Sequence, residues 1–176
     1  MNPKTERMAI SGVLIALHLV LCYVAVPAGP ITITFAGLPV LIGALLMGPV
    51  SGLCIGLLGS LMNQLFSYGL APTTPLWVLP TALYGLLAGL YAKRKGYALS
   101  RGQLTGIILF CSLMVTVLNS GVIALDAMIY HYKAAVMQLI LWRLASSAIR
   151  AVLYVVVIDL LIGRLRRAVD LTKIRE

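Results

Sequence analysis

LTGIILFCSLMVTVLNSGVIAL, the stretch from residue 104 to residue 125, contains no charged side chain. A transmembrane helix needs roughly 20 consecutive apolar residues, so this stretch is long enough to cross the hydrocarbon core of a bilayer. We therefore expect a membrane-spanning helix here. The rest of the fold depends on how many similar stretches lie on either side of it.

The composition of the whole chain agrees with a membrane protein. Of its 176 residues, 61% are hydrophobic and only 11% are charged, whereas a soluble domain has about 45–50% apolar and about 25% charged residues. A soluble fold of this size has too little interior to hide so much apolar surface. We expect one integral membrane domain that comprises residues 1–176.

Five further apolar stretches flank the first, and together they predict an all-α bundle of six transmembrane helices. The stretch at 33–47 is short and carries Pro39, so it is either a tilted or kinked span, which we favour, or a re-entrant segment. The last stretch is long and is interrupted by two arginines. The five stretches comprise residues 8–26, 33–47, 50–66, 76–92 and 135–163.

The basic residues are distributed unevenly between the two sides of this bundle. If the N-terminus is cytoplasmic, the outer loops hold only Lys133, and two further arginines lie inside the last helix. Such an excess on one side orients membrane proteins, which indicates cytoplasmic termini and a multi-pass protein of the cell membrane. Eleven of the fourteen basic residues then lie on the cytoplasmic side, namely Lys4, Arg7, Lys93, Arg94, Lys95, Arg101, Arg164, Arg166, Arg167, Lys173 and Arg175.

The first apolar stretch has a second interpretation as a cleaved signal peptide. Lys4 and Arg7 would form its basic region, and the small residues near Ala28 its cleavage site. The apolar core of a signal peptide has about 7–15 residues. The stretch at 8–26 is longer than that, which favours a retained span.

Motifs for catalysis, nucleotide binding or metal binding are missing from the sequence. The dipeptide Gly-Lys does not occur, so there is no phosphate-binding loop, and neither H-E-x-x-H nor G-x-S-x-G is present. His18 and His131 are isolated, and a structural role is the favoured one for His18. We expect no enzyme, no cofactor and no metal. Cys22, Cys54 and Cys111 are expected to be small core residues, and Asp159 to pair locally with Arg164, Arg166 or Arg167.

Arg143 and Arg150 are the most informative residues, because charges inside a bilayer are costly and usually face a protein interior. They are seven residues apart and therefore lie on nearly the same face of their helix. Counted from Ala135, Arg143 lies about 12 Å and Arg150 about 22 Å into the helix. Arg143 is the better candidate for binding a ligand. For the deeper Arg150 a structural role or a contact on the cytoplasmic side is favoured.

Other polar and aromatic residues lie at the level of Arg143 or nearer the outer surface, and together they predict a pocket open to the outside. A guanidinium there would bind a carboxylate through two hydrogen bonds, and aromatic side chains would stack on a flat ring. Alternatives stay open, since tryptophans also form interfacial belts, asparagine can join helices and Arg143 can be structural. The candidate ligand-binding residues are Arg143, Asn119, Tyr84, Trp77, Asn63, Gln64, Tyr68, Thr74 and Trp142.

Several motifs follow one another along the chain, namely ITFAGLPV at 33–40, LMGP at 46–49, the glycine-rich stretch from Gly52 to Gly59, TPLW at 74–77 and YGLLAG at 84–89. In these motifs the chain resembles the S components of energy-coupling factor (ECF) vitamin transporters, most of all their folate and pantothenate branch. The resemblance runs over nearly the whole chain, from about residue 8 to residue 165.

The resemblance implies a function and partners. Such a subunit captures a small water-soluble vitamin outside the cell and works with a transmembrane coupling subunit and two cytoplasmic ATPases. It also implies that the first helix meets the coupling subunit through small residues, for which this chain offers Ala9, Gly12 and Ala16. Small residues spaced in this way allow close approach of another helix.

Two other classes of protein remain as alternatives. A self-sufficient channel or secondary transporter would need an inverted repeat or a proton-relay acid at mid-depth. A membrane enzyme or assembly factor would need a catalytic cluster. None of these features is visible in the sequence, so a substrate-binding transporter subunit is the preferred interpretation.

Overall fold

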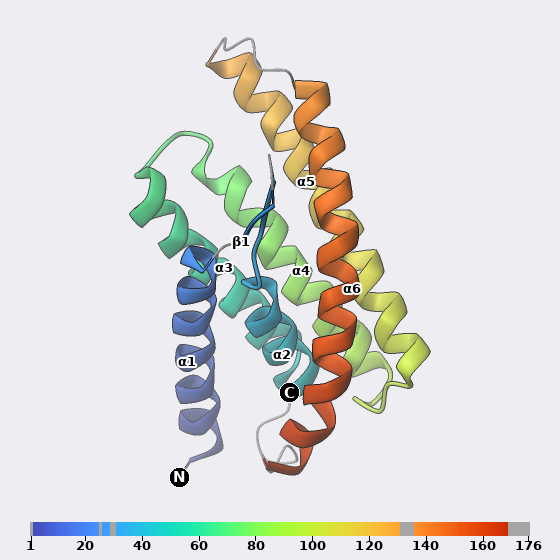
Figure 1. Cartoon of the computed structure of the whole chain (residues 1–176). Coiled ribbons are helices and arrows are strands. Elements are labelled where there is room, and N and C mark those ends of the chain that lie inside the picture. The colour runs from blue at the N-terminus through green and yellow to red at the C-terminus, as the bar shows by residue number, and fades with distance from the viewer. Residues whose placement is uncertain (1, 25, 29–30, 131–135, 169–176) are drawn as a thin grey trace.

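The computed structural model of the chain describes residues 2–24, 26–28, 31–130 and 136–168 (Figure 1). Within these residues the chain forms six helices and one short β-hairpin. The predicted all-α bundle is therefore confirmed, with the hairpin as an addition. The elements are α1 (Pro3–Tyr23), β1 (Val26–Ala28), β2 (Ile31–Ile33), α2 (Gly37–Met47), α3 (Pro49–Tyr68), α4 (Thr74–Arg94), α5 (Arg101–Ile129) and α6 (Val136–Ala168).

Five of the described helices, all except α2, are long and apolar enough to cross a membrane. With 11 residues, α2 has a length of only about 16 Å, about half the thickness of the hydrocarbon core. The expected span at 33–47 is thus wrong in its first part, because Ile33 ends strand β2 and the helix begins only at Gly37. β-branched residues at 31–33 pair with 26–28 as an antiparallel hairpin instead of continuing the helix.

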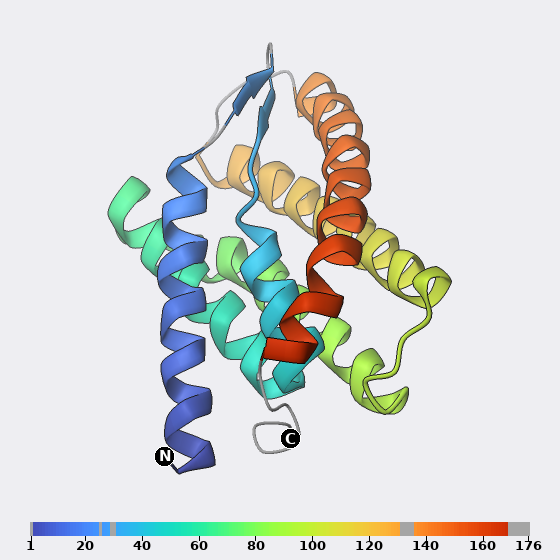
Figure 2. The ribbon, with the colours of Figure 1, turned by 60° about the horizontal axis from the view of Figure 1, so that its bottom comes forward.

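The short helix α2 is the most buried element of the described bundle. Its side chains from Leu38 to Leu41 and from Gly43 to Met47 are buried, and Figure 2 shows α2 between α1 and α6. A short helix is tolerated at membrane depth when other protein segments surround it. Burial in the bundle thus explains why α2 is apolar without being a full span.

Glycines bring α3 and α4 into backbone contact. A side chain on Gly52 would lie 2.6 Å from the carbonyl oxygen of Gly85 and 2.6 Å from Ala44 Cβ. A larger residue at Gly52 or at Gly85 would therefore require α3 and α4 to move apart. Close packing of this kind joins helices in lipid, where burial of apolar side chains does not favour association as it does in water.

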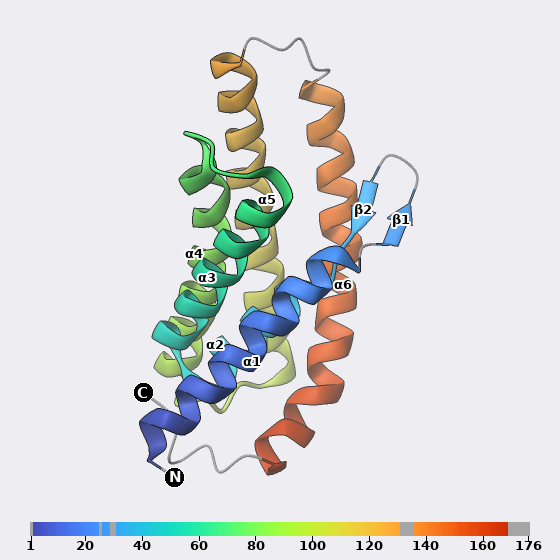
Figure 3. The ribbon, with the colours of Figure 1, turned by 90° about the vertical axis from the view of Figure 1, so that its left-hand side faces the viewer.

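The bundle has two distinct ends. Figures 1 and 3 show the start of α1, the end of α6 and the α4–α5 connection at one end, which we call the terminal end. The β-hairpin lies toward the opposite end, the hairpin end. Lys93, Arg94 and Lys95 are exposed at the terminal end. His131 and Lys133, which the sequence analysis placed in an outer loop, lie outside the described residues.

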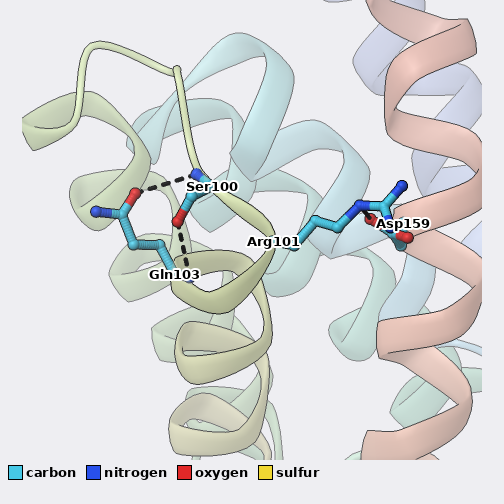
Figure 4. Close-up of polar contacts among 4 residues, drawn as sticks. All are labelled: Ser100, Arg101, Gln103 and Asp159. Carbon is cyan, nitrogen blue, oxygen red and sulfur yellow. Dashed lines mark hydrogen bonds and ion pairs between the residues drawn. The ribbon is translucent and has the colours of Figure 1, made fainter.

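Polar contacts hold the start of α5 at the terminal end (Figure 4). The Ser100 side chain accepts a hydrogen bond from Gln103 N at 3.3 Å, and Gln103 Oε1 accepts one from Ser100 N at 3.1 Å, which together form a capping box. Asp159 on α6 lies 3.4 Å from Arg101 Nε. Its ion pair therefore reaches across to α5, whereas a local pair on its own helix was expected; the side chains of Arg164, Arg166 and Arg167 lie outside the described part.

Candidate functional site

A cavity of about 270 Å³ lies between α1, α3, α4, α5 and α6, with the residues before α2 as part of its wall. It follows α6 from Arg143 to Tyr154, a rise of about 16 Å. At the other extreme it reaches Tyr68, the exposed last residue of α3. Its volume is just below the range of about 300–1,000 Å³ found for small-molecule sites.

Most of the candidate ligand-binding residues line this cavity. Two do not. Thr74 is the buried first residue of α4, and its Oγ1 accepts a hydrogen bond from Ala71 N at 2.9 Å. Trp142 faces outward with 40% of its surface exposed, because neighbours on a helix point about 100° apart and Arg143 faces inward. The residues that line the cavity are Asn63, Gln64, Tyr68, Trp77, Tyr84, Asn119 and Arg143.

Arg143 and Trp77 meet across the cavity. The guanidinium carbon of Arg143 lies 5.8 Å from the centre of the Trp77 ring, within range of a cation–π interaction. Trp77 Nε1 donates a hydrogen bond of 3.0 Å to Asp126 Oδ2 on α5. The indole is thus held from one side and stacks toward the arginine on the other, which the interpretation as an interfacial belt residue did not anticipate.

Arg150 also lines the cavity, about two helical turns deeper along α6 than Arg143. The structure thus places on the cavity a residue for which the sequence favoured a structural role or a contact on the cytoplasmic side. Its Nε is buried and has no hydrogen-bond partner among the described residues. Both arginines line the cavity because they are seven residues apart and therefore lie on nearly the same face of α6.

Three side-chain contacts hold the wall segment that precedes α2. Tyr154 Oη donates to Thr34 O at 3.0 Å and accepts from Gly37 N at 3.0 Å. His18 Nδ1 donates to Ala36 O at 2.7 Å. His18 therefore makes a structural contact of the kind favoured for it, although it also lines the cavity, and the floor of the cavity is tied to both α1 and α6.

Sequence reasoning missed further cavity residues, among them five serines and threonines on helices α3 to α6. They fall into stripes with the residues already named, at spacings of three, four and seven. This periodicity was the available signal, because hydroxyls on one face of an apolar helix indicate a polar interior. The stripes are Ser60, Asn63 and Gln64 on α3; Trp77, Thr81 and Tyr84 on α4; Ser112, Thr116 and Asn119 on α5; and Arg143, Ser147, Arg150 and Tyr154 on α6.

The described lining of the cavity is cationic and polar. Two guanidiniums line it, together with amides and hydroxyls, and none of its lining residues is an aspartate or glutamate. Among the described residues, no three His, Cys, Asp or Glu side chains are grouped so as to hold a metal ion. The arrangement suits an anionic solute with a flat ring that stacks on Trp77.

The small residues of α1 form a separate surface. Ala9, Gly12 and Ala16 are exposed, and a side chain added at Gly12 would meet no atom within 4 Å. None of the three lines the cavity. This face of α1 is accessible to another helix in the single chain.

Comparison with known proteins gives a consistent assignment. Residues 6–164 match the family described as ECF transporter, substrate-specific component. The chain is similar to the structure titled "Structure and mechanism of the S component of a bacterial ECF transporter", with a TM-score of 0.67 and 20% identity over 93% of this chain and 99% of that one. It is also similar to the structure titled "Crystal structure of FolT bound with folic acid", with a TM-score of 0.63 and 22% identity over 87% and 89% of the two chains. At these identities the two likenesses show the fold.

A curated relative adds a sequence match. The chain is 34% identical over 107 residues to a UPF0397 protein of Leuconostoc citreum (strain KM20), over 58% of this chain. The match covers 54% of the relative, so the chain spans about half the length of the curated relative it matches.

Proposed function

Because the chain belongs to the family of ECF transporter substrate-specific components, we propose that it is the solute-binding membrane subunit of an ATP-driven importer. It captures a small, water-soluble, vitamin-like molecule that carries a carboxylate. The observation that carries the proposal is the cavity, whose described lining includes two guanidiniums and no carboxylate. Buried cations in a membrane protein mark a functional site by default, and here an anionic solute supplies their partner.

The orientation of the bundle determines where the solute enters. The exposed cluster of Lys93, Arg94 and Lys95 lies at the terminal end, and basic segments are retained in the cytoplasm. The termini are then cytoplasmic, and the cavity lies in the half of the bundle that faces the outside of the plasma membrane. A solute enters past Tyr68, the exposed lining residue at the end of α3.

Arg143 and Trp77 define how the solute is held. Arg143 binds the carboxylate, and the Trp77 indole offers a stacking surface that Asp126 keeps in place. Folate-like and pantothenate-like molecules both carry a carboxylate, and a similar structure was solved with folic acid. Asn63, Gln64, Tyr68, Tyr84 and Asn119 supply the remaining polar contacts from α3, α4 and α5.

ATP hydrolysis comes from partner proteins, because the chain has no phosphate-binding loop. The partners are a transmembrane coupling subunit and two cytoplasmic ATPases. The coupling subunit docks on α1, where Ala9, Gly12 and Ala16 leave room for a helix. In this division of labour the chain binds its solute and carries out no chemical reaction.

The proposal is tested by identifying the solute that remains bound to the protein during purification. We would purify the protein from its own organism in mild detergent and identify bound small molecules by mass spectrometry. The Ser147→Leu variant fills the cavity, because Ser147 is buried in its wall, and Ala148→Leu is the matched control on an exposed position of the same helix. We expect a carboxylate-bearing solute with the wild type and the control, and none with Ser147→Leu. The same solute content in all three proteins would contradict the proposal.

A further inference from the structure

The cavity contains more positive charge than a single carboxylate can balance. Arg143 and Arg150 both line it, and none of the described acidic residues does. Of the acidic side chains that the structure describes, Asp126 lies behind Trp77 and accepts its indole N–H through Oδ2, while its buried Oδ1 has no hydrogen-bond partner among the described residues. Asp159 pairs with Arg101 at the terminal end. Glu6 lies in the first turn of α1, away from the cavity.

The two arginines belong to one continuous space. They are seven residues apart on α6, a rise of about 10 Å, with Ser147 between them on the same face. Trp77 and Tyr84 line the opposite wall with the same seven-residue spacing on α4. A single elongated solute can therefore contact both arginines while it lies along the aromatic wall.

The deeper arginine has a buried nitrogen without a hydrogen bond. Arg150 Nε is buried without a hydrogen bond among the described residues. Buried polar groups in native proteins are almost always hydrogen-bonded, and because this nitrogen lines the cavity, a bound solute can supply its partner. The amino-terminal end of α2 lines this same deep region through Ala36 and Gly37, and a helix N-terminus adds partial positive charge.

A solute with one negative charge would leave the other arginine without a counter-charge in a desolvated site. Burial of an unpaired charge is strongly unfavourable, and two like charges in the same cavity make it more so. A solute with two anionic groups satisfies both guanidiniums at once. The two arginines thus favour a solute with two anionic groups over a solute with one, a choice that the proposed function leaves open.

Building on the proposed function, we propose that the cavity selects solutes with two anionic groups, one bound by Arg143 and the other by Arg150, with the flat part of the solute against Trp77. Pantothenate-like solutes with one carboxylate are then poor ligands. Dicarboxylates with an aromatic ring are good ones. Arg150 is in this view a second anion-binding residue and a determinant of specificity.

Two probes that differ by one anionic group test this inference. Folic acid carries two carboxylates, and pteroic acid has the same ring system with one; pantothenate serves as a monoanion without an aromatic ring. Affinities would be measured by calorimetry on the purified full chain in detergent. We expect folic acid to bind at least tenfold more tightly than either monoanion, which corresponds to about 1.4 kcal/mol.

Variants assign the selectivity to Arg150. In Arg150→Gln the preference for the dianion should fall to about twofold or less, whereas Arg150→Lys, which keeps the charge, should retain part of it. Arg101→Gln is the control, because it removes a guanidinium that is 89% exposed at the terminal end and outside the cavity. Gel filtration and a melting curve with each variant establish that the protein is folded.

The outcomes separate this inference from the proposed function. A preference for folic acid that disappears in Arg150→Gln and persists in Arg101→Gln supports the inference. Equal affinity for the dianion and the monoanions, or a preference that survives in Arg150→Gln, overturns it and leaves the proposed function standing. If the chain binds none of the anions while a cationic or neutral solute co-purifies with it, the inference is overturned as well. If no solute binds at all, both ideas fail.

Discussion

Replacement of Arg143 by alanine removes the guanidinium that faces Trp77 at 5.8 Å. In the solute-free protein the change removes a cation–π interaction of about 0.5–2 kcal/mol, but it also removes a half-buried charge that lacks a carboxylate partner. These two effects oppose each other, so we expect the melting temperature to change little. The effect on binding should be much larger.

The expected loss of affinity follows from the charge-assisted hydrogen bonds to the solute. Removal of one partner of a desolvated ion pair costs about 2–5 kcal/mol. Arg143 is only partly buried, which places the loss near the lower end, at about 2–3 kcal/mol, or roughly 30- to 150-fold in the dissociation constant. The measurement is calorimetry in detergent with the solute that co-purifies with the wild type.

A matched control exists at the neighbouring position. Trp142→Ala removes a larger side chain from the same turn of α6, but its indole is 40% exposed and lies outside the cavity. We expect its affinity to stay within about twofold of the wild type, which is less than 0.5 kcal/mol. If Arg143→Ala binds the solute as tightly as the wild type, or if Trp142→Ala loses as much affinity as Arg143→Ala, the reasoning about the cavity is refuted.

Three further predictions concern assembly, packing and topology. Ala16→Trp should abolish co-purification of the coupling subunit and the ATPases at unchanged solute affinity, whereas Val152→Trp, at an exposed site on α6, should preserve both. Gly85→Ala should destabilise the bundle by about 1–3 kcal/mol in a melting experiment, since its Cβ would meet the Gly52 backbone; Gly106→Ala, with no atom within 4 Å, should not destabilise it. In a chain freed of native cysteines, Lys95→Cys should react with an impermeant maleimide only after the cells are opened, and labelling of intact cells would reverse the orientation.

Most of the architecture follows from the length and position of the apolar stretches. Five helices occur where about 20 apolar residues lie between turn residues, as expected for spans. The second segment shows the limit of this reasoning. Its composition is that of a span, but β-branched residues at 31–33 pair with 26–28, and only α2 remains helical. Strand pairing across a turn depends on tertiary contacts that an apolar run does not reveal.

The candidate site was predictable where helical periodicity applies. Arg143, Asn119 and Tyr84 lie at one level on three helices, and the structure places all three on one cavity. Thr74 and Trp142 were included for their chemistry and position in the sequence, but the direction of each side chain excludes them from it. That direction depends on how each helix is rotated within the bundle. Tertiary contacts, such as the one between Gly52 and Gly85, set this rotation, and the sequence alone does not reveal them.

Arg150 gives the clearest lesson about depth. Its distance along α6 suggested a place near the cytoplasmic side, whereas the cavity extends down the helix to Tyr154. The hydrogen bonds of Tyr154 to Thr34 and Gly37 form the floor at that level. Contacts 117 and 120 residues apart in sequence set the depth of the cavity, so no local pattern could have predicted it.

The central claim is that this chain binds a solute but depends on other proteins to accumulate it. The most direct test reconstitutes the wild-type chain into liposomes that contain ATP, with and without the coupling subunit and the two ATPases, and follows uptake of the radiolabelled solute identified by co-purification. We predict binding in both preparations and accumulation above the outside concentration only when the partners are present. Accumulation by the chain alone, driven by an ion gradient or by ATP, would contradict the account.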